Sequence, residues 1–178
     1  MAGRATALTG LRLLLAPVLH AAVMAERPVL ALLVFGLAVA TDFADGWAAR
    51  RFGEATPLGG LADHAVDAVF VTSGAAALAR IGALPALLPV LIPAAFLQYA
   101  LDSGRPGRDG LRASSLGRWN GIAYYAIVAV PIVRDALGIG WPGAPLVSAL
   151  GWVLVATTLV SMADRLIARL RTARGSPA

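Results

Sequence analysis

The chain has 178 residues, a formal net charge of +5, a hydrophobic fraction of 58% and only 14% charged residues. Its mean hydropathy of +0.75 is typical of a membrane protein and excludes an ordinary soluble core. The chain has no cysteine, two histidines and no lysine, which excludes a thiolate zinc site, a cysteine nucleophile, a histidine-rich metal site and a lysine Schiff base. The length predicts a single domain over residues 1–178.

The first two apolar segments predict membrane-spanning helices over residues 8–25 and from Pro28 onward. Arg12 lies one turn into the first helix, where it either extends to the interface or faces a site and binds phosphate. In the second helix, Asp42 and Asp45 lie about 21 and 26 Å from Pro28. The two carboxylates are therefore expected near the far interface of the bilayer, since its hydrocarbon core is about 30 Å thick.

Four aspartates lie on both sides of a predicted turn that contains Gly53 and Pro57. Asp42 and Asp45 share one helix face, and Asp63 and Asp67 share a face of the next helix. A helical hairpin would point these four carboxylates at one another. The residues of this motif are Asp42, Asp45, Gly46, Ala49, Arg50, Gly59, Asp63 and Asp67.

Carboxylates held close together in an apolar setting take up protons unless cations neutralise them. Their oxygens are hard ligands that suit Mg²⁺ or Mn²⁺, and two such ions about 3.5–4 Å apart promote displacement at phosphorus. Gly46, Ala49 and Gly59 leave space for a substrate against the backbone. The alternatives are structural ion pairs, a proton relay or ion coupling in a small transporter.

Further apolar segments predict helices over residues 58–81, 84–101, 115–137 and 141–162, with a polar helical tail after the last. The expected architecture is therefore an all-α bundle of about six transmembrane helices. Gly74 lies in a small-residue stretch that suits close helix contact, and Pro85, Pro89 and Pro93 should distort the fourth helix. His20 is expected to pack or cap, and His64 is a minor candidate for the site.

Two arginines near the start of the fifth helix are candidates for binding an acceptor or a phosphate. Arg118 lies one turn into an apolar helix, where an unpaired cation is costly, and Arg112 lies in the preceding polar loop. The other arginines predict the topology. Twelve arginines fall on the side of both termini and three on the other, so the termini and the aspartates should face the cytosol across a cell membrane. This distribution favours membrane topology over nucleic-acid binding.

The pattern D-x2-D-G-x2-A-R-x8-G-x3-D-x3-D resembles the signature of the CDP-alcohol phosphotransferase (CDP-alcohol phosphatidyltransferase) family. Thr9-x-x-Arg12 and the Ser-x-x-Gly-Arg stretch that ends at Arg118 also look like family features, although the Pro-Asn that often precedes the first is absent. Aspartate-rich membrane prenyltransferases share D-x2-D, but they usually carry another aspartate where this chain has Ala49.

The resemblance implies an integral membrane enzyme, usually dimeric, that transfers a phosphatidyl-type group from a CDP-linked lipid to an alcohol and releases CMP. Asp42, Asp45 and Asp63 would hold one or two divalent ions, and Asp67 would share an ion and act as the base. Gly46, Ala49 and Gly59 would accommodate the nucleotide, and Arg50 would pair with its phosphates or brace the hairpin.

Because Arg12, Arg112 and Arg118 suggest an anionic acceptor, glycerol 3-phosphate is the first expectation. Inositol phosphate, serine or another phospholipid are the alternatives.

Overall fold

The protein folds into six helices in a computed structural model that describes residues 3–52, 57–103 and 115–174. These residues contain no strand, so the all-α prediction is confirmed. The helices are α1 (Gly3–Met24), α2 (Pro28–Phe52), α3 (Pro57–Arg80), α4 (Leu88–Ser103), α5 (Ser115–Leu137) and α6 (Ala144–Arg174).

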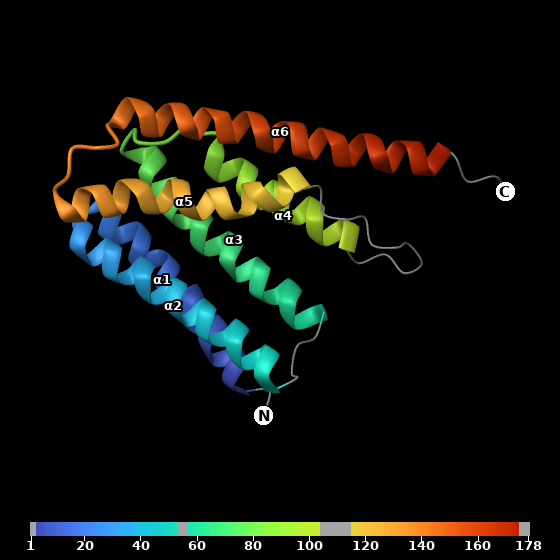
Figure 1. Cartoon of the computed structure of the whole chain (residues 1–178), viewed down its shortest axis with the longest axis horizontal. Helices are drawn as coiled ribbons and strands as arrows, with labels where there is room; N and C mark the ends of the chain where they lie inside the picture. The colour runs from blue at the N-terminus through green and yellow to red at the C-terminus, as the bar shows by residue number, and fades with distance from the viewer. Residues whose placement is uncertain (1–2, 53–56, 104–114, 175–178) are drawn as a thin grey trace.

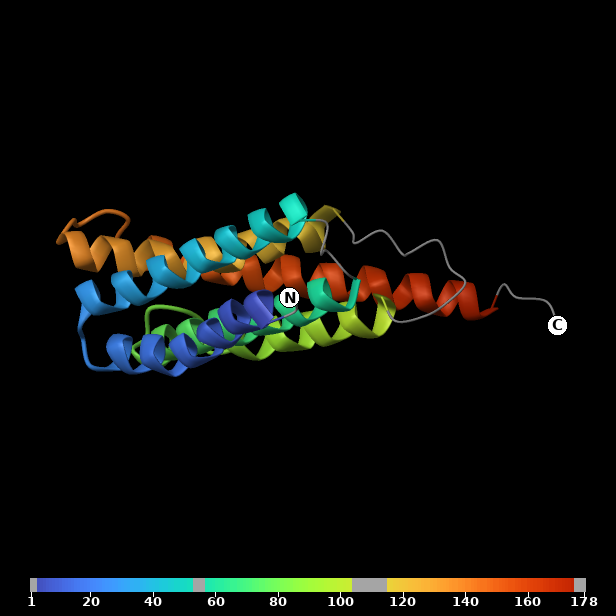
Figure 2. The same ribbon diagram turned by 90° about the horizontal axis from the view of Figure 1, so that it is seen from below.

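The helices pack in a closed ring in which α1 contacts α2 and α3, α4 contacts α3 and α6, and α5 contacts α2 and α6. A contact between α3 and α5 crosses the ring. Figures 1 and 2 show that the starts of α1, α3 and α5 lie at the same end of the bundle as the ends of α2, α4 and α6. The turn predicted between the aspartates falls mostly on residues 53–56, which lie outside the described residues.

Several predicted helix boundaries differ from the observed ones. The fourth helix begins at Leu88 rather than at residue 84, so Pro85 precedes it and Pro89 occupies its first turn, where a missing N–H costs nothing. Only Pro93 remains inside, so the predicted triple distortion is avoided. The last helix begins at Ala144 rather than at residue 141, and it runs without a break into the predicted polar tail.

Small residues allow the helices to approach closely. A Cβ added at Gly74 would lie 2.8 Å from Val128 of α5 and 3.1 Å from Leu19 of α1, so α3 packs tightly against both neighbours, as the sequence predicted. His20 also links α1 to α3, because its Nδ1 lies 3.1 Å from the carbonyl oxygen of Ser73. These contacts fix α1 against α3, and both helices carry residues of the candidate site described below.

Large apolar side chains are exposed on the outer face of every helix. One example from each of α1 to α6 is Leu14, Leu33, Val69, Val90, Ile122 and Val153. Within the described part of the chain, residues 59–80 and 144–170 form two segments long and apolar enough to cross a membrane. Shorter apolar helices cover residues 10–24, 28–44 and 88–102.

Candidate active site

Three of the predicted aspartates meet between α1, α2 and α3. Each of Asp42, Asp63 and Asp67 places a carboxylate oxygen within 4.8 Å of an oxygen of the other two. Their side chains are 41%, 34% and 18% exposed, respectively. Asp67 is thus the most enclosed member. This group, called the carboxylate cluster below, is the convergence that the helical hairpin predicted.

The guanidinium of Arg12 lies against the carboxylate cluster. Its Nη1 donates to Oδ1 of Asp42 at 2.8 Å and also to Asp67, while its Nη2 donates to Asp63. The Arg12 side chain is only 1% exposed, so it does not extend to the interface. Because one cation contacts residues of α2 and α3, Arg12 ties α1 to both halves of the hairpin.

The charges of this group fit a divalent cation. Three carboxylates and one guanidinium leave a formal charge of −2 on the described side chains. Carboxylate oxygens are the ligands that Mg²⁺ and Mn²⁺ prefer, and the three oxygens are close enough to approach one ion. The charge of one divalent ion would therefore be balanced by these side chains alone.

A cavity of about 590 Å³ adjoins the carboxylate cluster and lies between α3, α4, α5 and α6. Asp67 belongs to both the cluster and the cavity wall. The inner wall is largely apolar, and polar groups line part of it. They are His64, Asp67, Gln98, Tyr99, Arg118, Asn120, Tyr124, Tyr125, Thr158, Ser161 and Arg165. The volume is that of a small-molecule site.

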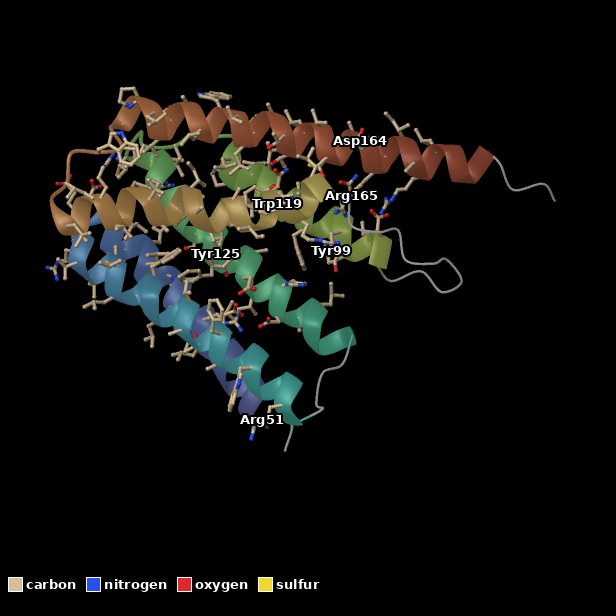
Figure 3. All side chains as sticks on the ribbon, viewed as in Figure 1. Arg51, Tyr99, Trp119, Tyr125, Asp164 and Arg165 are labelled. Carbon is tan, nitrogen blue, oxygen red and sulfur yellow. The ribbon has the colours of Figure 1, made fainter. Side chains whose placement is uncertain are left out.

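Most polar residues of this wall were not identified as site residues from the sequence, and Tyr125 and Arg165 are two examples. Tyr125 lines the same cavity wall as Asp67 and interacts electrostatically with its carboxylate, and it lies seven residues after Arg118 on one face of α5. Arg165 lies over the ring of Tyr99 at 5.6 Å, and Figure 3 shows these two side chains between α4 and α6. The seven-residue spacing could have identified Tyr125, whereas Arg165 appeared to belong to a solvated tail.

The predicted arginines differ in position. Arg118 is exposed and lines the cavity, whereas Arg12 faces the carboxylate cluster. Arg112 lies outside the described residues. His64 also lines the cavity, with its ring 6.2 Å from that of Tyr99.

The remaining motif residues lie on the same hairpin. Gly59 lies on α3 one turn before Asp63. Asp45, Gly46, Ala49 and Arg50 lie in the C-terminal part of α2, and their side chains are not among those that the structure describes.

The model of one protein family, CDP-alcohol phosphatidyltransferase, matches residues 3–170. The match covers all of the carboxylate cluster and all of the cavity wall. Neither a curated protein nor a solved structure matches the chain. With a family match over nearly its full length, the chain belongs to the CDP-alcohol phosphatidyltransferase family.

Proposed function

We propose that the protein is a metal-dependent membrane enzyme that transfers a phosphatidyl-type group from a CDP-linked lipid to an alcohol and releases CMP. CDP-diacylglycerol is the first choice of donor. The observation that carries the proposal is the shared position of Asp67 in the carboxylate cluster and in the cavity wall. An alcohol in the cavity would thus lie beside both a proton acceptor and a cation site.

The carboxylate cluster is proposed to hold Mg²⁺ or Mn²⁺. Asp42, Asp45 and Asp63 would bind one or two ions, and Asp67 would share one of them. A bound divalent ion would neutralise the diphosphate of the donor and stabilise CMP as the leaving group. The formal charge of −2 on the described group supports this assignment.

Asp67 is the proposed general base. The acceptor oxygen forms the new bond to phosphorus, the bond from phosphorus to the CMP oxygen breaks with its electron pair, and Asp67 takes the hydroxyl proton. Tyr125, in the same cavity wall, would help to orient the Asp67 carboxylate. Arg12 of α1 donates a hydrogen bond to the same carboxylate.

The C-terminal part of α2 and the start of α3 are proposed to hold the nucleotide. Gly46, Ala49 and Gly59 would leave room for the cytidine, because their side chains are absent or small. Arg50 would pair with the donor phosphates. These assignments follow the family motif.

The acceptor is proposed to be glycerol 3-phosphate, held in the cavity with its phosphate near Arg118 and Arg165. Arg112 is a further candidate for this phosphate. Arg12, the third candidate from the sequence, instead contacts three carboxylates of the cluster. Inositol phosphate is the nearest alternative, since it offers the same anionic group. Serine and another phospholipid are the remaining alternatives.

The six helices are proposed to form a multi-pass bundle in a cell membrane, with the active site and both termini facing the cytosol. The apolar side chains on every outer helix face support contact with lipid. The arginine asymmetry supports the orientation. A homodimer is proposed from the family resemblance.

Release of CMP by purified protein in detergent tests the proposal. We expect release from CDP-diacylglycerol with glycerol 3-phosphate and Mg²⁺ or Mn²⁺, and none after EDTA treatment. Free glycerol should be a much poorer acceptor, because it has no phosphate for Arg118 and Arg165. Equal use of both would contradict the phosphate assignment. No release with any of the proposed alcohols would contradict the transfer reaction and favour another role, such as ion-coupled transport.

A further inference from the structure

Arg165 of α6 places a guanidinium in the cavity wall without donating a hydrogen bond to any of the described residues. Its side chain is only 16% exposed. The guanidinium lies over the ring of Tyr99, 5.6 Å from the ring centroid. The face of an aromatic ring attracts positive charge, but it does not replace the hydrogen-bond acceptors that the guanidinium N–H groups need. These groups are therefore available to a ligand in the cavity.

The acidic residue beside this guanidinium is already paired with another arginine. Nη1 of Arg165 lies 3.9 Å from Oδ2 of Asp102 on α4, which is too far for a hydrogen bond. Nε of Arg169 instead donates to Oδ1 of the same carboxylate. Arg169 comes four residues after Arg165, so both arginines lie on one face of α6. Because the Asp102 side chain is only 8% exposed, its charge needs a partner, and Arg169 supplies it.

The two arginines therefore have different surroundings. Arg169 also donates to the carbonyl oxygen of Gln98 at 3.4 Å, so both of its contacts anchor it to α4. Arg165 and Tyr99 line the cavity, whereas Asp102 and Arg169 do not. A hydrogen-bonded guanidinium–carboxylate pair is among the strong polar contacts of proteins. Asp102 would consequently compete for Arg165 if Arg169 did not occupy it.

We infer that Arg169 is a positioning residue, which neutralises Asp102 and so keeps Arg165 over Tyr99 and available to the anionic group of the acceptor. This inference rests on the proposed function and adds to it a residue outside the cavity wall. Without Arg169, the Asp102 carboxylate would draw Arg165 into a direct ion pair. The cavity would then lose a cation although no residue of its wall had been replaced.

Titration calorimetry of the full chain in detergent with glycerol 3-phosphate tests the inference without requiring turnover. Arg169→Gln should weaken binding about tenfold, as much as Arg165→Gln, because either change removes the Arg165 guanidinium from the anion. Arg169→Lys should bind within about twofold of the wild type, since an ammonium group also pairs with Asp102. Arg134→Gln is the matched control, because it removes the cation of another arginine–aspartate pair that does not line the cavity. It should retain wild-type affinity.

Two double variants distinguish this role from the mere loss of a positive charge. In the Arg165→Gln background, Arg169→Gln should cause no further loss of affinity, because both changes act on the same contact. A long-range charge effect would instead weaken binding by the same factor in both backgrounds. Adding Asp102→Asn to Arg169→Gln should restore binding to within about twofold of the wild type, because no carboxylate then competes for Arg165. Thermal unfolding checks that each variant is folded.

Wild-type affinity in Arg169→Gln would overturn the inference, as would an equal loss in both backgrounds or a failure of Asp102→Asn to restore binding. A wild type that binds neither glycerol 3-phosphate nor inorganic phosphate would also overturn it. The proposed function is tested separately by CMP release. Binding that depends on Arg169 without CMP release would contradict the transfer reaction alone. CMP release with wild-type affinity in Arg169→Gln would contradict the positioning role alone.

Discussion

The carboxylate cluster and the cavity differ in how their buried polar groups are paired. In the cluster, carboxylates of α2 and α3 meet a guanidinium of α1, so one oxygen of each carboxylate has a charged partner inside the protein. In the cavity, Gln98 and Asn120 each keep one buried polar atom without a partner among the described residues. The first region is preassembled by its own counter-ion, whereas the second keeps two buried polar atoms unpaired behind its wall.

This difference indicates what each region binds. A cluster with a residual charge of −2 requires a cation, and it can exist beforehand because Arg12 limits the repulsion between its members. A cavity with two arginines in its wall suits an anion. Asp67 is common to both regions. Substitutions in the carboxylate cluster and substitutions in the cavity should therefore have separable effects on chemistry, stability and acceptor affinity.

Replacement of Asp67 by asparagine should produce the largest effect. We expect Asp67→Asn to lower kcat by about 10²–10⁴-fold, because an amide cannot take the hydroxyl proton. Binding of Mn²⁺, measured by electron paramagnetic resonance, should persist, since Asp42 and Asp63 remain. Asp135→Asn is the control, because Asp135 pairs with Arg134 at the opposite end of α5. Full activity of Asp67→Asn would exclude Asp67 as the base.

Replacement of Arg12 by glutamine tests its role as the counter-ion of the carboxylate cluster. Without metal, Arg12→Gln should lower the free energy of unfolding by about 1–3 kcal/mol, less than for a fully buried ion pair, because the carboxylates are partly exposed. Saturating Mn²⁺ should stabilise this variant more than the wild type, since the described charge falls from −2 to −3. Thermal unfolding with and without Mn²⁺ measures both effects.

Arg134→Gln provides the control for Arg12, because it removes a cation remote from the carboxylate cluster. It should leave the Mn²⁺-dependent shift in Tm unchanged. A smaller Mn²⁺ effect in Arg12→Gln than in the wild type would show that Arg12 supports cation binding instead of opposing it.

The two arginines of the cavity should affect acceptor affinity. We expect Arg165→Gln and Arg118→Gln each to raise KM for glycerol 3-phosphate about tenfold, which corresponds to about 1.4 kcal/mol. The KM for the CDP-linked donor should change little. Steady-state kinetics with each substrate varied in turn separates these effects. A larger change for the donor would place the donor diphosphate, not the acceptor phosphate, beside these residues.

The hairpin was predictable from local sequence, because spacings of three and four residues define a helix face and the short polar turn brings two faces together. Asp42, Asp63 and Asp67 meet as those spacings indicated. The fold class followed from the apolar segments. The start of α4 was placed four residues too early, because hydrophobicity extends through Pro85 while helical geometry does not.

The cavity was much harder to predict, because its wall depends on how distant helices pack. Arg165 follows an apolar segment and resembles a solvated residue in sequence, yet the contact between α4 and α6 places it over Tyr99. Arg12 admitted two sequence interpretations, and only the packing of α1 against the hairpin distinguishes them. An unpaired amide atom has no sequence signature at all, since its state depends on every neighbour.

Replacement of Asp102 by asparagine should have the smallest effect on turnover. It tests whether every charged residue near the cavity belongs to the active site. Its side chain is 8% exposed and pairs with Arg169, while Arg165 lies 3.9 Å away. Because these contacts join α4 to α6 and Asp102 does not line the cavity, Asp102→Asn should cost about 1–3 kcal/mol of stability and leave kcat unchanged. Thermal unfolding and CMP release measure the two quantities. A loss of kcat comparable to that of Asp67→Asn would extend the catalytic region to the end of α4, whereas lower stability with normal turnover would identify this ion pair as a structural link beside the acceptor cavity.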